Sequence, residues 1–366
     1  MKFIIKKNKL LKPLQKLNSI ICINHEYPMT SNILLEFQEN YIFLTSTNLE
    51  LELTTKIKLL NHHNNYSIVI SGKKIFNVIR SFPNDINLQI TCNTNNIYIA
   101  YENIQFTLNT ISANNFPKFS QEKNTTNITL PQEKIKNIIH HTAFSMAKQD
   151  IRHYLNGMYL EINKNKIFAI ATDGYRMALC NTTIHENNIK ISIIIPRKTI
   201  MELIKILQDC NTPLKICIGL KMVKFEINEY ILFSKLIDNE FPDYKNLFLQ
   251  EFQTILKINR KKLKTSLMRA AILTNRKFPG VKLYFHKEKC ILSAKNENNE
   301  IIKETIQICN TNDPIELTMN IHYILDVINV LQNEFITIYL NNNISRIYIQ
   351  NLEKYHSFYI IMPLII

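Results

Sequence analysis

Hydrophobic and polar positions alternate through three similar stretches of the chain, a pattern typical of half-buried antiparallel strands joined by a polar turn. The stretches are LLEFQENYIFLTSTN at 34–48, MYLEINKNKIFAIATD at 158–173 and VKLYFHKEKCILSAKN at 281–296. Their last residues are 125 and 123 residues apart. An aromatic or Met residue followed by proline recurs at a similar interval, at 116–117, 241–242 and 362–363. The chain is therefore predicted to repeat one unit of about 124 residues three times.

Each repeat also contains two segments with the spacing of amphipathic helices. The first segments are 10–21, 134–146 and 262–273, and the second are 73–82, 197–207 and 321–331. Pro13 is expected in the first turn of its helix, where a missing N–H is tolerated. The predicted fold class is α+β, with three tandem similar domains, each with two helices packed on antiparallel sheets. The predicted domains are 1–118, 126–245 and 246–366.

Basic side chains recur on the polar faces of these predicted helices. Lys9, Lys12 and Lys16 lie opposite the Leu stripe of the first helix, and similar faces follow. Those faces comprise Lys73, Asn77 and Arg80; Lys134, Asn137, His141 and Lys148; Lys198, Glu202 and Lys205; Lys262 and Arg269. Any amphipathic helix exposes lysine to solvent, but recurrence favours a shared surface for sequence-independent phosphate contact. The net charge of +14 is compatible with this interpretation, although a chain so rich in Asn, Ile and Lys also suggests AT-rich coding.

The motifs that usually carry catalysis are missing from the sequence. The five glycines are too scattered for a phosphate-binding or dinucleotide-binding loop, and no Asp-x-Asp pair is present to hold two metal ions. The adjacent pairs His62–His63 and His140–His141 lack metal-ligand spacing, and the seven cysteines include no Cys-x-x-Cys pair. We interpret Asp173–Gly174 as a turn. No catalytic residue, metal or cofactor is therefore predicted.

The length of 366 residues predicts two or three domains. No run of about 18 apolar residues is present, and the start of the chain has no secretory signal pattern. We therefore expect a cytoplasmic protein with no membrane association.

Several local sequences resemble the beta subunit family of bacterial DNA polymerase III, and the similarity extends from Met1 to Ile366. They are LLKPLQ, FSMAKQDIRHYLNGM at 144–158, ATDGYRMA at 171–178, IPRK at 195–198, NEFPDY at 239–244, RAAILTN at 269–275 and the terminal MPLII. The resemblance implies a non-catalytic subunit of a DNA-directed DNA polymerase holoenzyme. It implies a head-to-tail dimer that forms a closed ring around duplex DNA and slides without sequence specificity.

The resemblance also implies three sets of functional residues. DNA contact is implied for Lys73, Gln149, His153, Tyr154, Arg197, Lys198 and Asn24. A hydrophobic pocket for partner peptides is implied at Leu155, Thr172, Gly174, Tyr175, Arg176, Met177, Pro242, Leu247, Ile360, Met362, Pro363 and Leu364. A dimer interface is implied at Lys74, Phe106, Leu108, Ile272, Leu273, Glu300 and Glu304. The implied partners are double-stranded DNA, a second copy of the chain, the replicative polymerase alpha subunit, the clamp loader, repair polymerases, ligase and mismatch-repair proteins.

The chain departs from the family pattern at three single positions and at its C-terminal pair. Asn24 stands where the family often has Arg, Tyr175 replaces a common His, Asn246 replaces a common Arg, and the chain ends in Ile365–Ile366. The departures at Tyr175, at Asn246 and at the C-terminal pair point to an altered peptide preference, whereas the departure at Asn24 concerns the implied DNA contact. There are two alternatives to a ring-forming clamp. One is a monomeric, sequence-independent nucleic-acid-binding repeat protein, and the other is a phosphotransfer enzyme without the usual glycine and paired-Asp motifs.

Overall fold

The computed structural model describes residues 1–364 except 23–25, 121, 124, 185–188, 248–251, 253, 276–278, 342–344 and 352–355, and leaves aside the side chains of 61–64 and 309–313. The chain forms two compact units. The first unit contains Met1–Glu133 and Lys198–Leu236, and the second contains Lys134–Arg197 and Ile237–Ile366. None of the described helices is long and apolar enough to cross a membrane.

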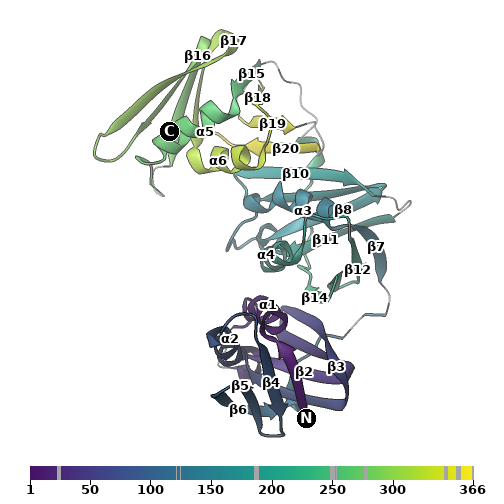
Figure 1. The fold of residues 1–366 in the computed structure, drawn as a ribbon. Coiled ribbons are helices and arrows are strands. Elements are labelled where there is room, and N and C mark those ends of the chain that lie inside the picture. The colour runs from purple at the N-terminus through teal and green to yellow at the C-terminus, as the bar shows by residue number, and fades with distance from the viewer. Residues whose placement is uncertain are drawn as a thin grey trace. The chain divides into compact units, whose positions relative to one another are not determined.

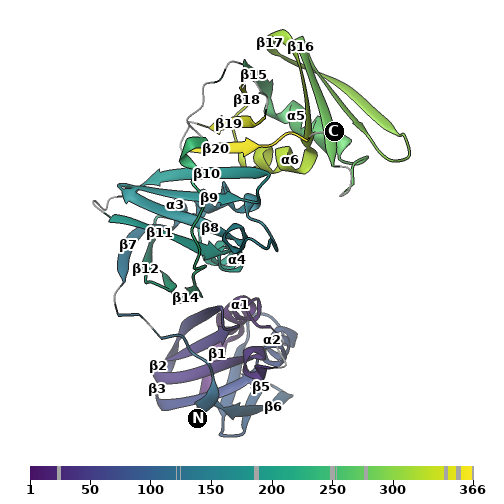
Figure 2. The same ribbon diagram turned by 180° about the vertical axis from the view of Figure 1, so that it is seen from behind.

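The first unit is built on a ten-stranded antiparallel sheet (Figure 1). Nine strands follow the order β1-β4-β5-β6-β3-β14-β13-β12-β7, and β2 pairs with β3. The strands are β1 (Lys2–Lys6), β2 (Asn32–Thr47), β3 (Leu51–Ser71), β4 (Asn87–Cys92), β5 (Asn96–Tyr101), β6 (Ile104–Ser112), β7 (Thr126–Pro131), β12 (Pro213–Ile218), β13 (Met222–Ile227) and β14 (Tyr230–Lys235). Its helices are α1 (Lys7–Asn18), α2 (Gly72–Ser81) and nearly all of α4 (Arg197–Ile206). In both views α1 and α2 lie side by side against the strands of the first repeat (Figure 2).

The second unit has its own ten-stranded antiparallel sheet, in the order β11-β8-β9-β10-β20-β19-β18-β15-β17-β16. The strands are β8 (Gly157–Lys164), β9 (Lys166–Thr172), β10 (Arg176–Thr183), β11 (Ile189–Pro196), β15 (Thr254–Asn259), β16 (Gly280–Lys295), β17 (Ile301–Asn320), β18 (Phe335–Leu340), β19 (Ile347–Asn351) and β20 (His356–Ile361). Its helices are most of α3 (Gln132–His140), which begins two residues before the unit, α5 (Arg260–Ala270) and α6 (Ile321–Val330). β16 and β17 form a long hairpin that is visible in both ribbon views.

Each sheet joins strands from two sequence repeats. In the first unit, β14 of the central repeat pairs with β3 of the first repeat, from Tyr230 opposite Thr55 to Ser234 opposite Leu51. In the second unit, β10 of the central repeat pairs with β20 of the last repeat. The strands of the central repeat are therefore divided between the two sheets, and the compact units do not coincide with the three repeats.

The backbone repeats itself at residues with left-handed φ angles. Glu39, Lys164 and Lys287 have φ values of 52°, 56° and 52°, and they occupy matching positions in the three alternating stretches. The predicted strand–turn–strand arrangement is present as two separate strands in the central repeat, where β8 and β9 pair across Lys164. In the other repeats it needs correction, because β2 and β16 are single long elements whose register shifts at Glu39 and Lys287. The ladder is interrupted at each irregularity, and the long partner strands β3 and β17 resume pairing on the other side of it.

All six predicted helices form within a few residues of the expected limits. The largest difference is in the helix predicted at 134–146, which runs from Gln132 to His140. The first helix is shifted by three residues: it begins at Lys7, directly after β1, and ends at Asn18. Pro13 therefore lies inside the helix and is buried, which corrects its expected place in the first turn. Because proline has no N–H, the helix loses one internal hydrogen bond there. The burial of Leu10, Leu14 and Leu17 on the same face stabilises it.

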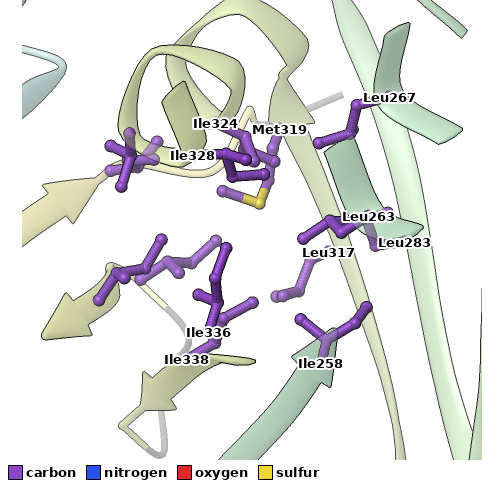
Figure 3. Packing of buried hydrophobic residues seen from close by; sticks show 14 of the residues in the cluster. Ile258, Leu263, Leu267, Leu283, Leu317, Met319, Ile324, Ile328, Ile336 and Ile338 are labelled. Carbon is purple, nitrogen blue, oxygen red and sulfur yellow. The ribbon is translucent and has the colours of Figure 1, made fainter. Parts of the chain in front are cut away.

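The core of the last repeat shows how helices and sheet are held together. Leu263 and Leu267 of α5 and Ile324 and Ile328 of α6 belong to one buried cluster with residues of the sheet (Figure 3). The sheet residues labelled in that view are Ile258, Leu283, Leu317, Met319, Ile336 and Ile338. Burial of a Leu or Ile side chain stabilises the folded state by about 1.5–3 kcal/mol, so this cluster is a major source of stability.

Candidate nucleic-acid, partner and dimer interfaces

In the first unit, the basic face predicted for α1 is present. Lys9 and Lys12 are exposed, while the Leu stripe of the same helix is buried. Lys16 is partly buried, and its Nζ lies 4.2 Å from the centre of the Tyr230 ring. Burial lowers the pKa of Lys16, Glu229 opposes this effect, and Lys12 lowers the pKa further. The helix therefore combines solvated cations with one cation held against an aromatic ring.

Two further lysines implied for DNA contact are exposed on this unit. Lys73 lies in the first turn of α2. Lys198 lies in the first turn of α4, and its Nζ is 3.1 Å from Oε2 of Glu50. Both partners of that ion pair are mostly exposed, so the pair contributes less than about 1 kcal/mol to stability. Lys198 thus remains able to exchange Glu50 for a phosphate group.

In the second unit, a folded loop carries three of the residues implied for DNA contact. Gln149 and His153 are exposed and Tyr154 is half-buried. The Asn156 side chain holds the loop, because its Oδ1 accepts from the Asp150 N–H at 2.8 Å and its Nδ2 donates to the Asp150 carbonyl at 2.7 Å. These bonds fix Gln149 and His153 on either side of a closed loop.

The other two residues implied for DNA contact are Arg197 and Asn24, and the structure describes only Arg197. Arg197 is half-buried, donates from Nη1 to the Met146 carbonyl at 2.9 Å, and has its pKa lowered by burial and by Arg176. Asn24 lies outside the described residues. His141, which the helix pattern placed on a basic face, is buried instead, and its Nδ1 is 2.8 Å from the Tyr359 hydroxyl. The polar face of the third helix is therefore narrower than its spacing suggested.

The predicted partner pocket centres on the turn between β9 and β10. The Thr172 hydroxyl donates to the Arg176 carbonyl at 2.7 Å and accepts from the Gly174 N–H at 3.1 Å. The Asp173 carboxylate accepts from the N–H groups of Tyr175 and Arg176. Gly174 has a φ of 91°, which a residue with a side chain rarely adopts. The interpretation of this segment as a turn is confirmed.

Arg176 is held from three sides. Its Nε donates to Asp173 at 3.0 Å, its Nη1 donates to Asp326 of α6 at 2.6 Å, and its Nη2 donates to the Phe144 carbonyl at 2.6 Å. The guanidinium also lies 4.3 Å from the centre of the Tyr323 ring. Because only 11% of the side chain is exposed, Arg176 acts as a rigid tie between β10 and α6.

The apolar residues of the predicted pocket gather on one face of the second sheet. Met177 on β10 lies opposite Ile360 on β20 and opposite Thr172 on β9. Leu247 packs against the same buried cluster. Exposed Met362 continues this surface, and its N–H donates to the Tyr175 carbonyl at 2.9 Å. Tyr175 itself is 62% exposed, so an aromatic ring stands at the rim where the family commonly has His.

A hollow of about 310 Å³ opens on this face, beside Met177 and Ile360. Its apolar lining is Phe168, Leu179 and Phe358, and Leu179 and Phe358 are paired one step along β10 and β20 from Met177 and Ile360. Its polar lining is Glu161, Asn163, Asn181, Tyr244 and Lys245. The twelve predicted pocket residues do not line this hollow.

The remaining predicted pocket residues are spread over several elements of the second unit. Pro242 is exposed, whereas Leu155 is buried within the 146–156 loop, where its carbonyl accepts from the Ala147 N–H at 3.0 Å. Pro363 is half-buried, and the N–H of Leu364 donates to the Thr318 carbonyl of β17 at 2.7 Å. Asn246 donates to the Asp243 carboxylate at 3.0 Å, and Ile365 lies outside the described residues.

The residues implied for dimer contact lie on exposed surfaces of the two units. Phe106 and Leu108 are half-buried on β6, which pairs with β3 only at residues 110–112, so its 104–109 segment is paired on one side. Ile272 is 81% exposed after α5, and Leu273 is half-buried. An exposed apolar side chain and a half-paired strand are both typical of protein interfaces.

Two of the charged residues of this set, Glu300 and Glu304, make contacts within the chain. The Arg269 guanidinium donates to the Glu304 carboxylate, and this contact lowers the pKa of Glu304. Glu300 interacts with the Asn296 side chain, and Lys74 is exposed on α2. A partner lysine that approaches Glu304 would therefore share it with Arg269.

Several residues at these surfaces were not anticipated from the sequence. The Arg152 guanidinium lies so close to Gly174 that an added Cβ would be 2.9 Å from Nη2. Glu161 is buried and accepts from the Tyr244 hydroxyl at 2.6 Å and from Lys245 Nζ at 3.1 Å. Tyr244 and Lys245 lie in the sequence FPDYK, part of which carries the family resemblance. Their buried partner Glu161 lies 83 residues before Tyr244, and the sequence around it does not indicate this contact.

The whole chain matches models of one family. The N-terminal, central and C-terminal domains of the DNA polymerase III beta subunit match residues 1–120, 129–243 and 245–365. The chain is 34% identical over 364 residues to the beta sliding clamp of Buchnera aphidicola subsp. Acyrthosiphon pisum and 31% identical to that of Escherichia coli K12, with 100% of both chains covered in each case. A crystal structure of the DNA polymerase III beta subunit from Pseudomonas aeruginosa has a TM-score of 0.93 and 30% identity over 100% of both chains, and a griselimycin-bound structure has a TM-score of 0.95.

Three successive domains with helices on shared antiparallel sheets define a DNA clamp fold. The chain belongs to the DNA polymerase III beta subunit family, the bacterial sliding clamps. It is a non-catalytic processivity factor of DNA replication. The predicted family and function are confirmed, and the monomeric binding protein and the phosphotransfer enzyme are not favoured.

Proposed function

We propose that two copies of the chain close head to tail into a ring around duplex DNA and slide along it through loose phosphate contacts. The observation that carries this proposal is the match of all three clamp domains over the whole chain, in a protein whose first helix presents a lysine face. Contacts to phosphate position a protein without reading sequence, which is what sliding requires. The proposed domain boundaries are 1–118, 126–245 and 246–366.

The proposed DNA contacts are polar or aromatic side chains supplied by both units. They are Lys73, Gln149, His153, Tyr154, Arg197, Lys198 and Asn24. Lys73 and Lys198 have freedom to follow a moving phosphate backbone, because their side chains are solvated and at most weakly paired. Arg197 is held by the Met146 carbonyl and supplies a fixed charge.

The proposed dimer contact joins the half-paired segment of β6 to the exposed end of α5. Phe106 and Leu108 would meet Ile272 and Leu273, and Lys74 would lie near Glu300 and Glu304. A head-to-tail contact that closes after two copies gives a ring without open edges. Burial of Ile272 on assembly would remove an apolar side chain from water.

The proposed partner site is the apolar face formed by Met177, Leu247 and Ile360 with Met362 at its edge. A short apolar segment of the polymerase alpha subunit, the clamp loader, a repair polymerase, ligase or a mismatch-repair protein would bind there. The hydrogen-bonded turn at 172–176 and the ties made by Arg176 keep the site preformed. Preorganisation reduces the entropic cost of binding. We place the protein in the cytoplasm, where the replication machinery works.

The ring proposal is tested by retention on circular DNA. The protein is loaded on nicked circular DNA by a clamp loader, and retention is measured before and after the DNA is linearised. We expect retention on the circle and rapid loss after linearisation, because a ring slides off a free end. Equal retention on both forms would contradict a topological link and favour electrostatic binding.

The dimer contact is tested by Ile272→Ala combined with Leu273→Ala. We expect the native mass to fall from that of two chains to that of one at low protein concentration. Leu220→Ala is the matched control, because Leu220 is 91% exposed but lies outside the proposed contact. An unchanged dimer mass for the double variant would rule out this interface.

A further inference from the structure

The hollow of about 310 Å³ on the face of the second sheet lies entirely within the second unit. Its floor is apolar and consists of Phe168 on β9, Leu179 on β10 and Phe358 on β20. These three strands are neighbours in the sheet, so the floor is one continuous patch (Figure 2). None of the residues that the family resemblance implies for DNA, partner or dimer contact lines the hollow. Its occupant therefore has to be inferred from its lining.

The strand register places the hollow directly beside the proposed partner site. Met177 and Ile360 of that site lie opposite each other, and the pair Leu179 and Phe358 lies two residues farther along the same strands. Side chains two residues apart on a strand point to the same face and are separated by about 6.6 Å. Met177, Leu179 and Ile360 belong to one buried cluster, and Phe358 packs against it. The floor of the hollow therefore continues the apolar face of the partner site.

The same face becomes polar at the far end of the hollow. Asn181 lies there, opposite Phe168 on one side and His356 on the other. The next row of residues across the sheet contains Asn163 opposite Lys166. Lys166 and His356 are exposed, and neither makes an ion pair with the described part of the chain. The face thus changes from apolar to polar over the length of about four residues of extended chain.

The wall of the hollow adds a further cation. The Glu161 carboxylate accepts from the Tyr244 hydroxyl at 2.6 Å and from Lys245 Nζ at 3.1 Å. Burial, followed by the bond to Glu161, raises the pKa of Tyr244, so the hydroxyl stays protonated and continues to donate. Glu161 is the only carboxylate in the described lining, and these two bonds already satisfy it. Because the Lys245 side chain is 60% exposed, it is able to meet a second carboxylate from outside.

An extended peptide matches this arrangement of apolar and basic residues. A peptide that starts in the proposed partner site presents alternate side chains to the sheet, with the same spacing as the rows of the sheet. Its next apolar side chain would reach the floor of the hollow, and an acidic side chain beyond it would lie near Lys166 and Lys245. The side-chain amides of Asn163 and Asn181 are able to donate to and accept from the peptide backbone.

We propose that the hollow holds an extension of the partner peptide, with one apolar side chain on the floor and an acidic side chain beside Lys166 and Lys245. The proposal rests on the proposed function, because the apolar face at Met177 and Ile360 must hold the first part of the same peptide. It deepens that function, because the hollow would determine which partners bind. A peptide without the apolar and acidic extension would bind through its first part alone, and more weakly.

Two variants test the hollow, each with a matched control. Asn181→Trp fills the hollow and leaves its floor intact. Thr182→Trp is its control, because Thr182 is the next residue of β10, is also half-buried and points to the opposite face of the sheet. Lys166→Gln with Lys245→Gln removes the two cations. Its control is Lys282→Gln with Lys289→Gln, which removes two exposed cations from β16 at the far end of the sheet.

The probes are synthetic peptides with side chains that alternate between the sheet and solvent. The full probe is Ser-Leu-Ser-Leu-Ser-Leu-Ser-Asp-Ser, and the truncated probe has Ser in place of its last Leu and its Asp. Versions with the reversed order of residues cover the other direction of the chain. Methyl NMR gives the affinity and the position of each probe, since Met177 and Ile360 report on the partner site and Leu179 reports on the hollow. Native mass and urea unfolding establish that all variants fold like the parent chain.

We expect one version of the full probe to bind the parent chain at least about tenfold more tightly than its truncated counterpart, because one more leucine is buried. Asn181→Trp should remove this gain without changing the affinity of the truncated probe, whereas Thr182→Trp should keep it. The double lysine variant should bind the full probe severalfold more weakly, and its control should match the parent chain. A gain that persists in Asn181→Trp, or no gain in the parent chain, would overturn the proposal.

The NMR signals separate this proposal from the proposed partner site. Shifts of Met177 and Ile360 with both probes, but no gain for the full probe, would leave the partner site standing and remove the extension. A full probe that shifts Leu179 without Met177 and Ile360 would overturn the extension and the partner site, and would indicate an independent peptide site. Probes that shift none of these signals would overturn both proposals.

Discussion

The two compact units share one architecture and present surfaces of opposite character. Each has a ten-stranded antiparallel sheet that joins strands of two repeats. The first unit contains a groove lined by seven lysines, whereas the second contains a hollow floored by Phe168, Leu179 and Phe358. Because the backbone arrangement is so similar, the difference comes from the side chains placed on it. The fold supplies positions, and the residues on those positions decide the chemistry of each surface.

The units also bury opposite kinds of ionisable group. In the first unit, burial raises the pKa of Glu52 to about 7, although a bond from the Phe119 N–H and the charge of Lys118 oppose this. In the second unit, burial and His140 lower the pKa of His141 to about 4. Each fold therefore favours the neutral form of its buried group, and the two groups respond to pH in opposite directions.

The largest expected effect comes from a cavity in either core. Leu14→Ala in the first unit and Leu267→Ala in the second each remove a side chain that is 0% exposed. Each change should lower the free energy of unfolding by about 2–5 kcal/mol, because the transfer energy is lost and a cavity remains. Urea unfolding followed by hydrogen exchange should locate the loss of protection in the unit that carries the substitution.

The control for both cavities is Leu220→Ala, since Leu220 is 91% exposed and its truncation leaves no cavity. Uniform loss of protection over both units would show that they unfold together. The two units would then differ in their surfaces but not in their stability.

The second prediction uses pH to separate the units. Glu52 has a folded pKa above its ordinary value of 4.5, so the folded state holds a proton that the unfolded state releases between pH 4.5 and 7. The stability contributed by Glu52 is full below pH 4.5 and is lost as the pH rises through 7. His141 has a folded pKa below 6.5, so its contribution is present above pH 6.5 and is lost as the pH falls to about 4. Each effect amounts to about 3 kcal/mol.

Glu52→Gln and His141→Gln measure these effects, because all other titrating groups cancel in the difference from the parent chain. Glu52→Gln should gain stability relative to the parent as the pH rises from about 5 to about 8, and His141→Gln should gain as the pH falls from about 7 to about 4.5. Gln at position 52 retains an acceptor for the Phe119 N–H. Differences that do not vary with pH in urea unfolding would refute the assigned pKa directions.

The sequence predicted the helices and the threefold repeat, because both depend on local periodicity. The alternating stretches and the six helices have patterns that a single repeat displays completely. The division of the central repeat between two sheets was not predictable, because the pairing of Tyr230 with Thr55 joins residues with no common local pattern. Propensity and spacing do not specify which strand edges meet.

The residues of the candidate sites also fall into two groups, those predicted from local spacing and those whose surroundings only the structure shows. Lys9 and Lys12 follow from helix spacing, so the basic face of α1 was predicted. Lys56 and Lys58 alternate with buried residues in a strand, a pattern typical of any solvated sheet face, so their place in the groove required the structure. His141 has the spacing of a polar helix face but is buried beside Tyr359, which lies 218 residues later. Sites made from distant segments carry no signal in either segment alone.

The third prediction concerns the tie made by Arg176. Arg176→Ala leaves Asp173 and Asp326 without their shared cation and removes the contact with the Tyr323 ring. Because Asp326 is partly exposed and can be solvated, the expected loss of stability is about 2 kcal/mol, less than for a fully buried pair. An apolar peptide should also bind more weakly to the second unit, since the 172–176 turn loses its anchor.

Arg176→Lys is the informative companion variant. It keeps one charge but loses the fork that reaches two carboxylates and the Phe144 carbonyl, so it should fall between the parent and the alanine variant in stability and in peptide affinity measured by calorimetry. Peptide affinity equal to that of the parent in both variants would mean that the tie supports the fold and not the proposed partner site.

The smallest expected effect concerns Lys198, and it separates the surface from the fold most sharply. Its pair with Glu50 joins two side chains that are 59% and 66% exposed, so Lys198→Gln should change the free energy of unfolding by less than about 0.5 kcal/mol. Duplex DNA should nevertheless bind severalfold more weakly, with a salt slope shallower by about 0.9, because one cation no longer reaches a phosphate. Glu50→Gln is the matched variant: it breaks the same pair but leaves the lysine for DNA, so binding should be unchanged or tighter. Equal weakening by both variants would show that the pair itself orders the surface. Tighter binding by Glu50→Gln alone would show that Glu50 competes with phosphate for Lys198.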